Sequence, residues 1–335
     1  MSLENAKSFL NKVLLNRLGY RICHNSMLYD WQKCPQQLPD NKSRLPADAE
    51  SYLLTNNPIL RELRERYSIF DDRITDSDWK NDHVGSKNLS LLYFRRDNAY
   101  VFQRRGQNND ISGYALATYY LKSIDTLALL EKLEEDDFFG VYTFHIDNKT
   151  ISRDLLDSIS EIYFLRKYLD IETYNILDIG AGYGRLAHRL LTAFPSVKNY
   201  LCTDAIAEST FISEYYLRFH KQDRGKVIPF DKIEDTMKSQ NIDIALNIHS
   251  FSECRISAVE YWLSLLVEHR VKYLFIVPNG LAHGDKHFLS TTGEDIEKVI
   301  ETHGYKLIIK EPKYSDQVVQ QYAINPSYYY LYELQ

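Results

Sequence analysis

The fold of this chain is decided by the stretch Asn175-Ile176-Leu177-Asp178-Ile179-Gly180-Ala181-Gly182-Tyr183-Gly184-Arg185-Leu186-Ala187. Residues 176–179 are typical of a buried strand, three glycines at alternate positions follow, and a helical pattern begins after the last glycine. Because glycine lacks a Cβ and accepts positive φ angles, Gly180 and Gly182 allow a ligand to lie against the backbone. The free N–H groups of the following helix point towards that ligand. The stretch therefore predicts a nucleotide-binding turn at the edge of a parallel sheet.

The glycine spacing distinguishes between two kinds of nucleotide. A dinucleotide turn has G-x-G-x-x-G, whereas here the third glycine comes one position earlier and Asp178 stands two residues before the first. A carboxylate attracts a cationic group and repels a pyrophosphate. At every position, 178–184 resembles the first motif of class I S-adenosylmethionine (SAM)-dependent methyltransferases, D/E-x-G-x-G-x-G. The resemblance implies SAM as cofactor, bound around Asp178, Gly180, Ala181, Gly182 and Gly184, whereas a tight turn without a ligand is the alternative.

The second half of the chain alternates between strand-like and helix-like segments. The strand-like runs are 175–179, 199–203, 226–230, 242–247, 273–277, 305–310 and 328–333. Helical stretches separate most of them, which predicts an α/β fold with a parallel, doubly wound sheet. No helix is expected between the last two runs, so the final strand can run antiparallel. This layout is similar to the Rossmann-like class I methyltransferase domain, with seven strands and the last one reversed, over residues 151–335.

Residues 1–150 lack this alternation and are expected to form a mixed, mainly helical region that acts as a substrate lid or specificity domain. Residues 1–20 have an amphipathic helical pattern, 25–50 read as an irregular loop, and 114–135 read as a helix broken near Ser123. Residues 89–94 and 99–103 are expected to form a β-hairpin. Four arginines at its ends suit a phosphate or carboxylate of an acceptor, or are solvated strand ends: Arg95, Arg96, Arg104 and Arg105.

Three segments of the sequence make the resemblance to methyltransferases more specific. They are Ile151-Ser152-Arg153-Asp154-Leu155-Leu156, the glycine stretch through Leu186, and Asn247-Ile248-His249-Ser250-Phe251-Ser252-Glu253. Together they look like a family of sugar O-methyltransferases, whose members methylate hydroxyl groups of polysaccharides or related glycoconjugates. The resemblance implies a carbohydrate-type acceptor and adds Arg153 and Asn247 to the residues expected at the cofactor.

Two more acids follow strand-like runs. Asp204 directly follows the 199–203 run, where Rossmann-like folds place a carboxylate that accepts both ribose hydroxyls. A helix N-cap is the alternative for Asp204, and Glu208 is a second candidate for the ribose. Asp231 follows the 226–230 run, where class I enzymes commonly place an acid or amide for the adenine amino group, although it suits the cap of helix 232–239 equally well.

His249 and Glu253 are the candidate catalytic residues, because they leave the fourth strand at the edge where open α/β sheets bind ligands. In methyl transfer a substrate oxygen attacks the methyl group of a sulfonium in line, so the protein aligns the atoms and removes the hydroxyl proton. Histidine titrates near neutrality, which makes His249 the first candidate base; a loop histidine held by hydrogen bonds is the alternative. Glu253 is the second candidate base, with a metal ligand or a helix cap as alternatives.

A polar loop after the fifth strand places His283, Asp285 and His287 at alternate positions. His283 and Asp285 are expected to contact the substrate, while a metal site and a solvated loop are the alternatives. No metal is expected, because the loop lacks the paired acids typical of magnesium sites.

Composition bounds the function. The chain has 335 residues, of which 44% are hydrophobic and 26% charged, as in an ordinary globular protein. The net charge of −6 does not indicate a basic surface of the kind that binds nucleic acids. Four cysteines without C-x-x-C spacing favour a reducing cytoplasm, and neither a transmembrane run nor a signal-peptide pattern is evident. A methyltransferase of another small molecule or of a protein, a non-catalytic SAM-binding scaffold, and an oligomeric state all stay open.

Overall fold

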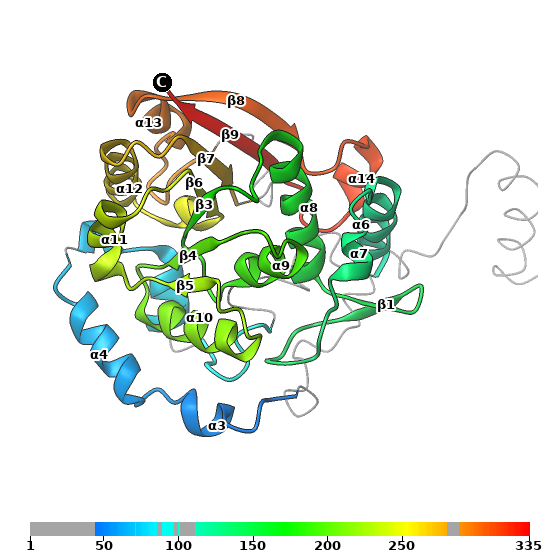
Figure 1. Cartoon of the computed structure of the whole chain (residues 1–335), viewed down its shortest axis with the longest axis horizontal. Coiled ribbons are helices and arrows are strands. Elements are labelled where there is room, and N and C mark those ends of the chain that lie inside the picture. The colour runs from blue at the N-terminus through cyan, green and yellow to red at the C-terminus, as the bar shows by residue number, and fades with distance from the viewer. Residues whose placement is uncertain (1–43, 71, 86–88, 97–99, 101–110, 280–287) are drawn as a thin grey trace, which may run out of the picture.

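A computed structural model describes residues 44–70, 72–85, 89–96, 100, 111–279 and 288–335. A seven-stranded sheet forms the centre of the molecule (Figure 1), with the strand order β5-β4-β3-β6-β7-β9-β8. Strands β3 to β8 run parallel, and β9 runs antiparallel to both of its neighbours, β7 and β8. The predicted α/β fold with a reversed last strand is therefore confirmed. The strands are β3 (Asn175–Ile179), β4 (Asn199–Thr203), β5 (Gly225–Val227), β6 (Ile244–Ile248), β7 (Tyr273–Val277), β8 (Tyr305–Pro312) and β9 (Tyr328–Leu334).

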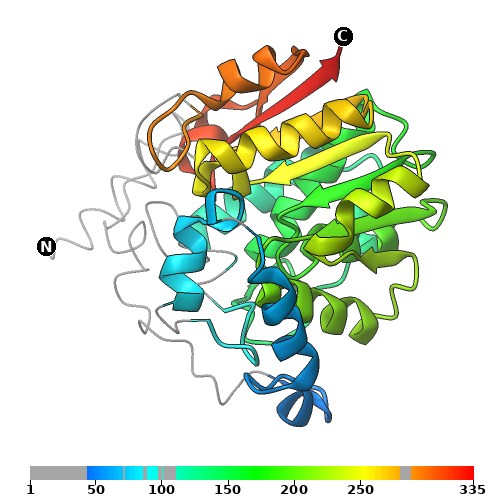
Figure 2. The ribbon, with the colours of Figure 1, turned by 90° about the vertical axis from the view of Figure 1, so that its left-hand side faces the viewer.

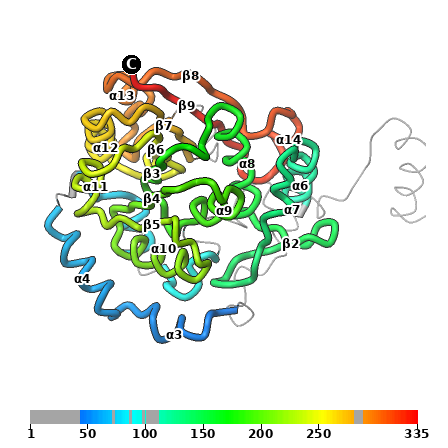
Figure 3. Tube along the Cα trace, viewed as in Figure 1, coloured from blue at the N-terminus to red at the C-terminus, as the bar shows by residue number. Residues whose placement is uncertain are grey.

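Helices cover both faces of this sheet, because successive side chains of a strand point to opposite sides. Leu177 of β3 belongs to the apolar core on one face, and Ile176 belongs to the core on the other. The first core includes α10 (Ala207–Phe219), α11 (Ile233–Ser239), α12 (Ile256–Glu268) and α13 (Ile296–Thr302). The second includes α8 (Arg153–Tyr168) and α9 (Arg185–Ala193). The tube trace in Figure 3 shows the same layers; α12 and α9 belong to the cores on opposite faces of the sheet.

The N-terminal region packs onto these layers. Its described elements are α3 (Ala49–Tyr52), α4 (Pro58–Tyr67), α5 (Asp72–Thr75), η4 (Lys80–Gly85), α6 (Ile111–Ile124), α7 (Leu129–Lys132), β1 (Phe144–Ile146) and β2 (Lys149–Ile151). Helix α4 contacts α10, α5 contacts α12, and α6 contacts α8. Figure 2 shows the blue and cyan N-terminal helices beside the sheet, at the end towards which the yellow arrow of β6 points. The backbone of Ser77, between α5 and η4, pairs there with that of Cys254.

Local sequence explains where several helices begin and end. Asn57 accepts a hydrogen bond from the Ile59 N–H, and Pro58 occupies the first turn of α4. Helix α8 begins at Arg153 because the Ser152 side chain accepts from the Leu155 N–H. The break predicted near Ser123 is confirmed, since α6 ends at Ile124.

Three expectations are wrong. Residues 89–94 form bends and turns instead of a hairpin strand, because Phe94 and Arg95 are drawn into buried contacts. The strand expected over 226–230 ends at Val227, and the short helix η5 (Phe230–Lys232) follows Pro229, which lacks an N–H for the sheet. A helix, α14 (Gln317–Tyr322), lies between β8 and β9, where Asp316 caps it.

The patterns at 1–20 and over most of 25–50, the proposed strand residues 101–103, and Arg104 and Arg105 lie outside the described residues. Within the described part of the chain, no helix combines the length and the apolar character needed to cross a bilayer.

Candidate cofactor and catalytic site

A cavity lies at the carboxyl ends of β3, β4 and β6, where the glycine turn, the segment after β6 and the N-terminal region meet. Open α/β sheets bind ligands at this edge. The lining residues are Ser77, Trp79, Tyr100, Arg153, Asp157, Asp178, Gly180, Ala181, Gly182, Tyr183, Arg185, Leu186, Asp204, Ile206, Ser209, Ile248, His249, Ser250, Glu253 and Cys254. Eight of the thirteen predicted site residues thus line this wall, and Gly184 lies between two lining residues, Tyr183 and Arg185.

The glycine turn has the backbone that only glycine adopts easily. Gly180, Gly182 and Gly184 have φ angles of +73°, +58° and +84°. The N–H groups of Gly180 and Ala181 both donate to the carbonyl oxygen of Thr203, at 2.9 and 3.1 Å, which ties the turn to the end of β4. The turn is therefore held in a fixed position beside the cavity.

Protein side chains lie close to two of these glycines. A Cβ on Gly182 would stand 2.8 Å from Cδ1 of Tyr100, and a Cβ on Gly180 would stand 2.4 Å from Oγ of Ser250. The sequence suggested that glycine is needed here for a ligand. The structure adds a second reason, since the protein's own side chains also approach the turn closely.

Two buried carboxyl groups flank the turn. Asp178 accepts a hydrogen bond from the Tyr200 hydroxyl at 2.8 Å, and Asp204 accepts from the N–H groups of Gly182 and Ile206, at 3.1 and 2.9 Å. Burial raises the pKa of each carboxyl to about 7. A cation in the cavity would stabilise the ionised forms of both.

The N-cap role weighed for Asp204 does not occur. Helix α10 has Ile206 as its N-cap and no side-chain cap, and Asp204 closes a turn two residues long through its bond to the Ile206 N–H. Each Asp204 oxygen accepts one N–H bond, and the Ser209 side chain also contributes a hydrogen bond to this carboxyl, which has four lone pairs in all.

The wall contributed by α8 and α9 carries paired charges. The Nε of Arg153 donates to Asp157 at 3.0 Å, and Arg185 binds Glu161 through two nitrogens at 2.9 and 3.0 Å. Lys313, which is buried, also donates to Asp157. These cations hold the pKa of the Asp157 carboxyl well below its usual range. Arg153 and Arg185 thus give this end of the cavity guanidinium groups that the protein itself keeps in place.

The two candidate bases both lie on the wall but differ in acidity. His249 has a φ angle of +69°, which is unusual for a residue with a Cβ, and its N–H donates to the Val277 carbonyl at 2.7 Å. Burial, together with nearby Arg153, lowers the pKa of His249 to about 3, so its imidazole is neutral at pH 7. Glu253 ends η6 (Ser250–Glu253), and burial raises its pKa to about 7. A base works best when its pKa is near the working pH, so these pKa values favour Glu253 over His249.

Asn247 and Asp231 are engaged by the protein. Asn247 is fully buried, and its amide joins the Ile179 carbonyl, at 3.0 Å, to the Phe251 N–H, at 2.9 Å. It therefore positions the segment after β6 instead of lining the cavity. Asp231 lies outside the lining and accepts bonds of 2.7 and 2.9 Å from Nη2 of Arg66 on α4. Lys232 is the N-cap of α11, so Asp231 is no cap either.

Three predicted candidates remain: Glu208, His283 and Asp285. Glu208, the second candidate for the ribose, binds Arg64 of α4 at 2.7 Å and is absent from the lining. His283 and Asp285 lie outside the described residues, so their contacts with a substrate stay a prediction.

Sequence reasoning missed the contribution of the N-terminal region to the wall. The Tyr100 hydroxyl is 3.0 Å from Oγ of Ser209, and its ring centroid is 4.9 Å from that of Trp79 and 5.5 Å from that of Tyr183. Trp79 and Tyr100 are isolated aromatics in a segment without regular periodicity. No signal in the sequence indicated that they reach the glycine turn.

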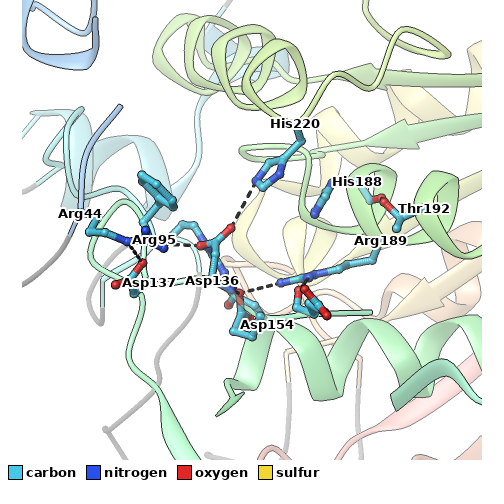
Figure 4. Close-up of polar contacts among 12 residues, drawn as sticks. Arg44, Arg95, Asp136, Asp137, Asp154, His188, Arg189, Thr192 and His220 are labelled. Atoms are coloured by element: carbon cyan, nitrogen blue, oxygen red, sulfur yellow. Dashed lines mark hydrogen bonds and ion pairs between the residues drawn. The ribbon is translucent and has the colours of Figure 1, made fainter. Parts of the chain in front are cut away.

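Arg95 belongs to a separate buried cluster, shown in Figure 4. Its guanidinium binds Glu135, Asp136 and Asp154 at 2.7, 2.6 and 3.1 Å, and its side chain is fully buried. Arg189 shares Glu135 at 2.8 Å. The idea that Arg95 docks a phosphate of the acceptor is therefore wrong, because three carboxylates already occupy its donors.

Two histidines border that cluster. His220 lies 3.6 Å from Asp136, and its ring stacks on that of His188 with centroids 3.8 Å apart. Burial lowers the pKa of His220 to about 4, so the His220 imidazole beside Asp136 and His188 is neutral at pH 7. These side chains join the N-terminal region to α8, α9 and α10 and take no part in lining the cavity.

Neither the models of known protein families nor the curated proteins give a significant match to this sequence. Among solved structures, a magnesium protoporphyrin IX methyltransferase from Synechocystis PCC 6803 with bound SAM matches at 12% identity and a TM-score of 0.42, over 80% of this chain and 99% of that one. A SAM-dependent methyltransferase from Clostridium acetobutylicum ATCC 824 matches at 15% identity and a TM-score of 0.38, over 53% and 90% of the two chains. An N,N-8-amino-8-demethyl-D-riboflavin dimethyltransferase from Streptomyces davawensis matches at 15% identity and a TM-score of 0.36, over 55% and 58%. Identities and TM-scores this low identify neither the acceptor nor the reaction of this chain.

Proposed function

We propose that this protein is a SAM-dependent O-methyltransferase that acts on a sugar hydroxyl. The observation that carries the proposal is the pair of buried carboxyls, Asp178 and Asp204, on either side of a glycine turn at the ligand edge of the sheet. Both lack a contacting cation among the described residues, and both would gain from one. SAM carries a net positive charge, which such a site favours.

The residues of the cavity fit the groups of SAM. Asp178 suits the ammonium of the methionine part, and Arg153 on the facing wall suits its carboxylate. The carboxylate of Asp204 suits the ribose hydroxyls. Gly180, Ala181 and Gly182 border the same space. Asp231 could accept from the adenine amino group only after Arg66 releases it.

When bound, SAM supplies an activated methyl group on a sulfonium. The protein then has to place the acceptor hydroxyl in line with that methyl and to receive its proton. Glu253 is our choice of acceptor for the proton, since its carboxylate lines the cavity and Asn279 Nδ2 orients it at 3.0 Å. The ring N–H of neutral His249 can donate a hydrogen bond to the oxygen of the same hydroxyl and fix its direction.

Our assignment of a carbohydrate as the methyl acceptor rests on the resemblance of residues 151–156, 178–186 and 247–253 to the sugar O-methyltransferases. The aromatic ring of Trp79 at the cavity is compatible with it, because an aromatic face packs against the C–H face of a sugar ring. A different acceptor would leave the cofactor part of the proposal intact.

Calorimetry with SAM tests the cofactor assignment. We expect binding to the wild type and, at 100 times the dissociation constant, a stabilisation of about 2.7 kcal/mol against unfolding. Asp178→Asn should weaken binding, whereas Asp235→Asn, an exposed acid on α11, should leave it unchanged. A folded wild-type protein that binds neither SAM nor its demethylated product would overturn the proposal.

A further inference from the structure

The two ends of the cavity differ in charge. At the α8 end, both lining arginines are already held: Arg153 by Asp157 and Arg185 by Glu161. Their partners are buried carboxylates, and Asp157 also receives Lys313. Within the described part of the wall, these two guanidinium groups are the cations, and the protein's own acids engage both.

The other end is formed by Glu253 and the segment around Trp79. Glu253 lines the cavity, and Asp78 lies close enough to raise the pKa of its carboxyl further. The pKa of Asp78 is itself raised, by partial burial and by the charges of Asp82 and Asp76. Arg255 binds Asp76 at 2.8 Å and its charge also lowers the pKa of Asp78, but the acids together still raise that pKa. A phosphate entering here would meet carboxylates that already repel one another.

Trp79 supplies the apolar surface at this end. Its ring is half-buried and lies 4.9 Å from the Tyr100 ring and 5.1 Å from the His83 ring, measured between centroids. This packing fixes the indole at the cavity wall. The bridge between Ser77 and Cys254 keeps this ring beside the segment that carries Glu253. An apolar ring and a carboxylate on one cavity wall together suit an uncharged ring that bears hydroxyl donors.

Building on the proposed function, we propose that the acceptor is a sugar that carries no phosphate or nucleotide, held between the Trp79 ring and the Glu253 carboxylate. Its hydroxyl oxygen forms the new bond to the methyl carbon while the bond from that carbon to sulfur breaks and sulfur keeps the electron pair. The hydroxyl proton passes to the Glu253 carboxylate. Trp79 binds the sugar without touching the reacting atoms, so it acts as a specificity residue.

The test measures release of demethylated SAM with a panel of methyl hexosides, the matching hexose 6-phosphates and the matching UDP-hexoses. We expect a kcat/KM at least 10-fold higher for the best methyl hexoside than for its charged counterparts. A preference for a phosphorylated or UDP-linked sugar would overturn the proposal and would direct attention to Arg104, Arg105 and Lys286, outside the described residues. Turnover of no neutral sugar by protein that binds SAM in calorimetry would also overturn it.

Variants separate binding from chemistry. Trp79→Ala should raise the KM for the methyl hexoside at least 10-fold with kcat within 3-fold, and Trp79→Phe should restore most of the loss. Asp78→Lys should lower the preference for neutral over phosphorylated sugar at least 5-fold, while the matched charge reversal Asp235→Lys should not. An unchanged KM in Trp79→Ala, or an unchanged preference in Asp78→Lys, would contradict the proposal. A folded wild-type protein that does not bind SAM would instead contradict the proposed function.

Discussion

Two groups of desolvated carboxyls, one in the Arg95 cluster and one in the cavity, behave in opposite ways. In the Arg95 cluster (Figure 4), Glu135 contacts both Arg95 and Arg189, and these cations lower its pKa to about 2 despite complete burial. In the cavity, burial raises the pKa of Asp178, Asp204 and Glu253 to about 7. The first group has its cations supplied by the protein and stabilises the fold. The second group has been desolvated without a contacting cation, which is typical of a site arranged for a ligand.

The largest expected effect concerns Glu253. Glu253→Gln should slow methyl transfer by roughly 10²–10⁴-fold, the usual contribution of a positioned general base, and should leave SAM affinity nearly unchanged. Because the ionised carboxyl is the active form, wild-type kcat should fall as pH drops below about 7, and the variant should lose this dependence. His249→Ala serves as the comparison and should cost less, since the His249 pKa of about 3 makes it a poor base.

Stopped-assay rates over pH 5–9 would decide between the two residues. If His249→Ala were the slower variant and Glu253→Gln retained activity, His249 would be the base, as the sequence first suggested. EDTA should have little effect on either rate; strong inhibition reversed by Mg²⁺ or Mn²⁺ would show a metal mechanism instead.

Arg95→Met tests the other side of the comparison. Removing one partner of a buried ionic cluster leaves its carboxylates uncompensated, and we expect a loss of about 3–5 kcal/mol in the free energy of unfolding. Urea denaturation measures it. Arg61→Met, at an exposed position on α4, is the control and should change stability by less than about 0.5 kcal/mol. Equal stability of the two variants would mean that the cluster contributes nothing to the fold.

Asp204 lies between the two kinds of carboxyl, because it accepts backbone bonds and also faces the cavity. Asp204→Ala should weaken SAM binding by about 1.5–3 kcal/mol through loss of charge-assisted hydrogen bonds. Calorimetry and urea denaturation on the same variant separate the roles. A fall in stability with unchanged SAM affinity would assign Asp204 to the turn alone.

The last prediction concerns the dependence of stability on pH. The pKa of Asp178 rises from about 3.9 in an unfolded chain to about 7 in the folded one, so folding favours its protonated form. Its contribution is therefore present at low pH and is lost as pH rises from about 4 to about 7, by on the order of 1 kcal/mol per pH unit. Glu135 has the opposite sign, since its lowered pKa makes its contribution disappear as pH falls towards 2.

Denaturation curves of wild type and Asp178→Asn between pH 4 and 8 check this sign. The free energy of unfolding should fall less with rising pH in the variant than in the wild type. Saturating SAM should also make this fall smaller in the wild type. A wild-type stability that rises steadily from pH 4 to pH 7 would show that the cavity carboxyls are ionised at low pH.

The sequence by itself determined the sheet, the glycine turn and the acids beside it. Continuous apolar runs of strand length, and glycines that need positive φ angles, are local properties, so β3, β4 and β7 and the position of Asp178 follow from neighbours in the chain. The same holds for the start of α8 at the Ser152 cap. Failures also had local causes, as where Pro229 ended β5 early.

Only the tertiary structure decided which side chains share the cavity and how acidic they are. Trp79 and Tyr100 come from a part of the chain distant from Glu253, and nothing in their local sequence indicates that they line the same wall. A pKa depends on how much water surrounds a group and which charges lie within a few ångströms of it. That is why residues 247–253 suggested both His249 and Glu253 as bases, and the packing around them separates a pKa of about 3 from one of about 7.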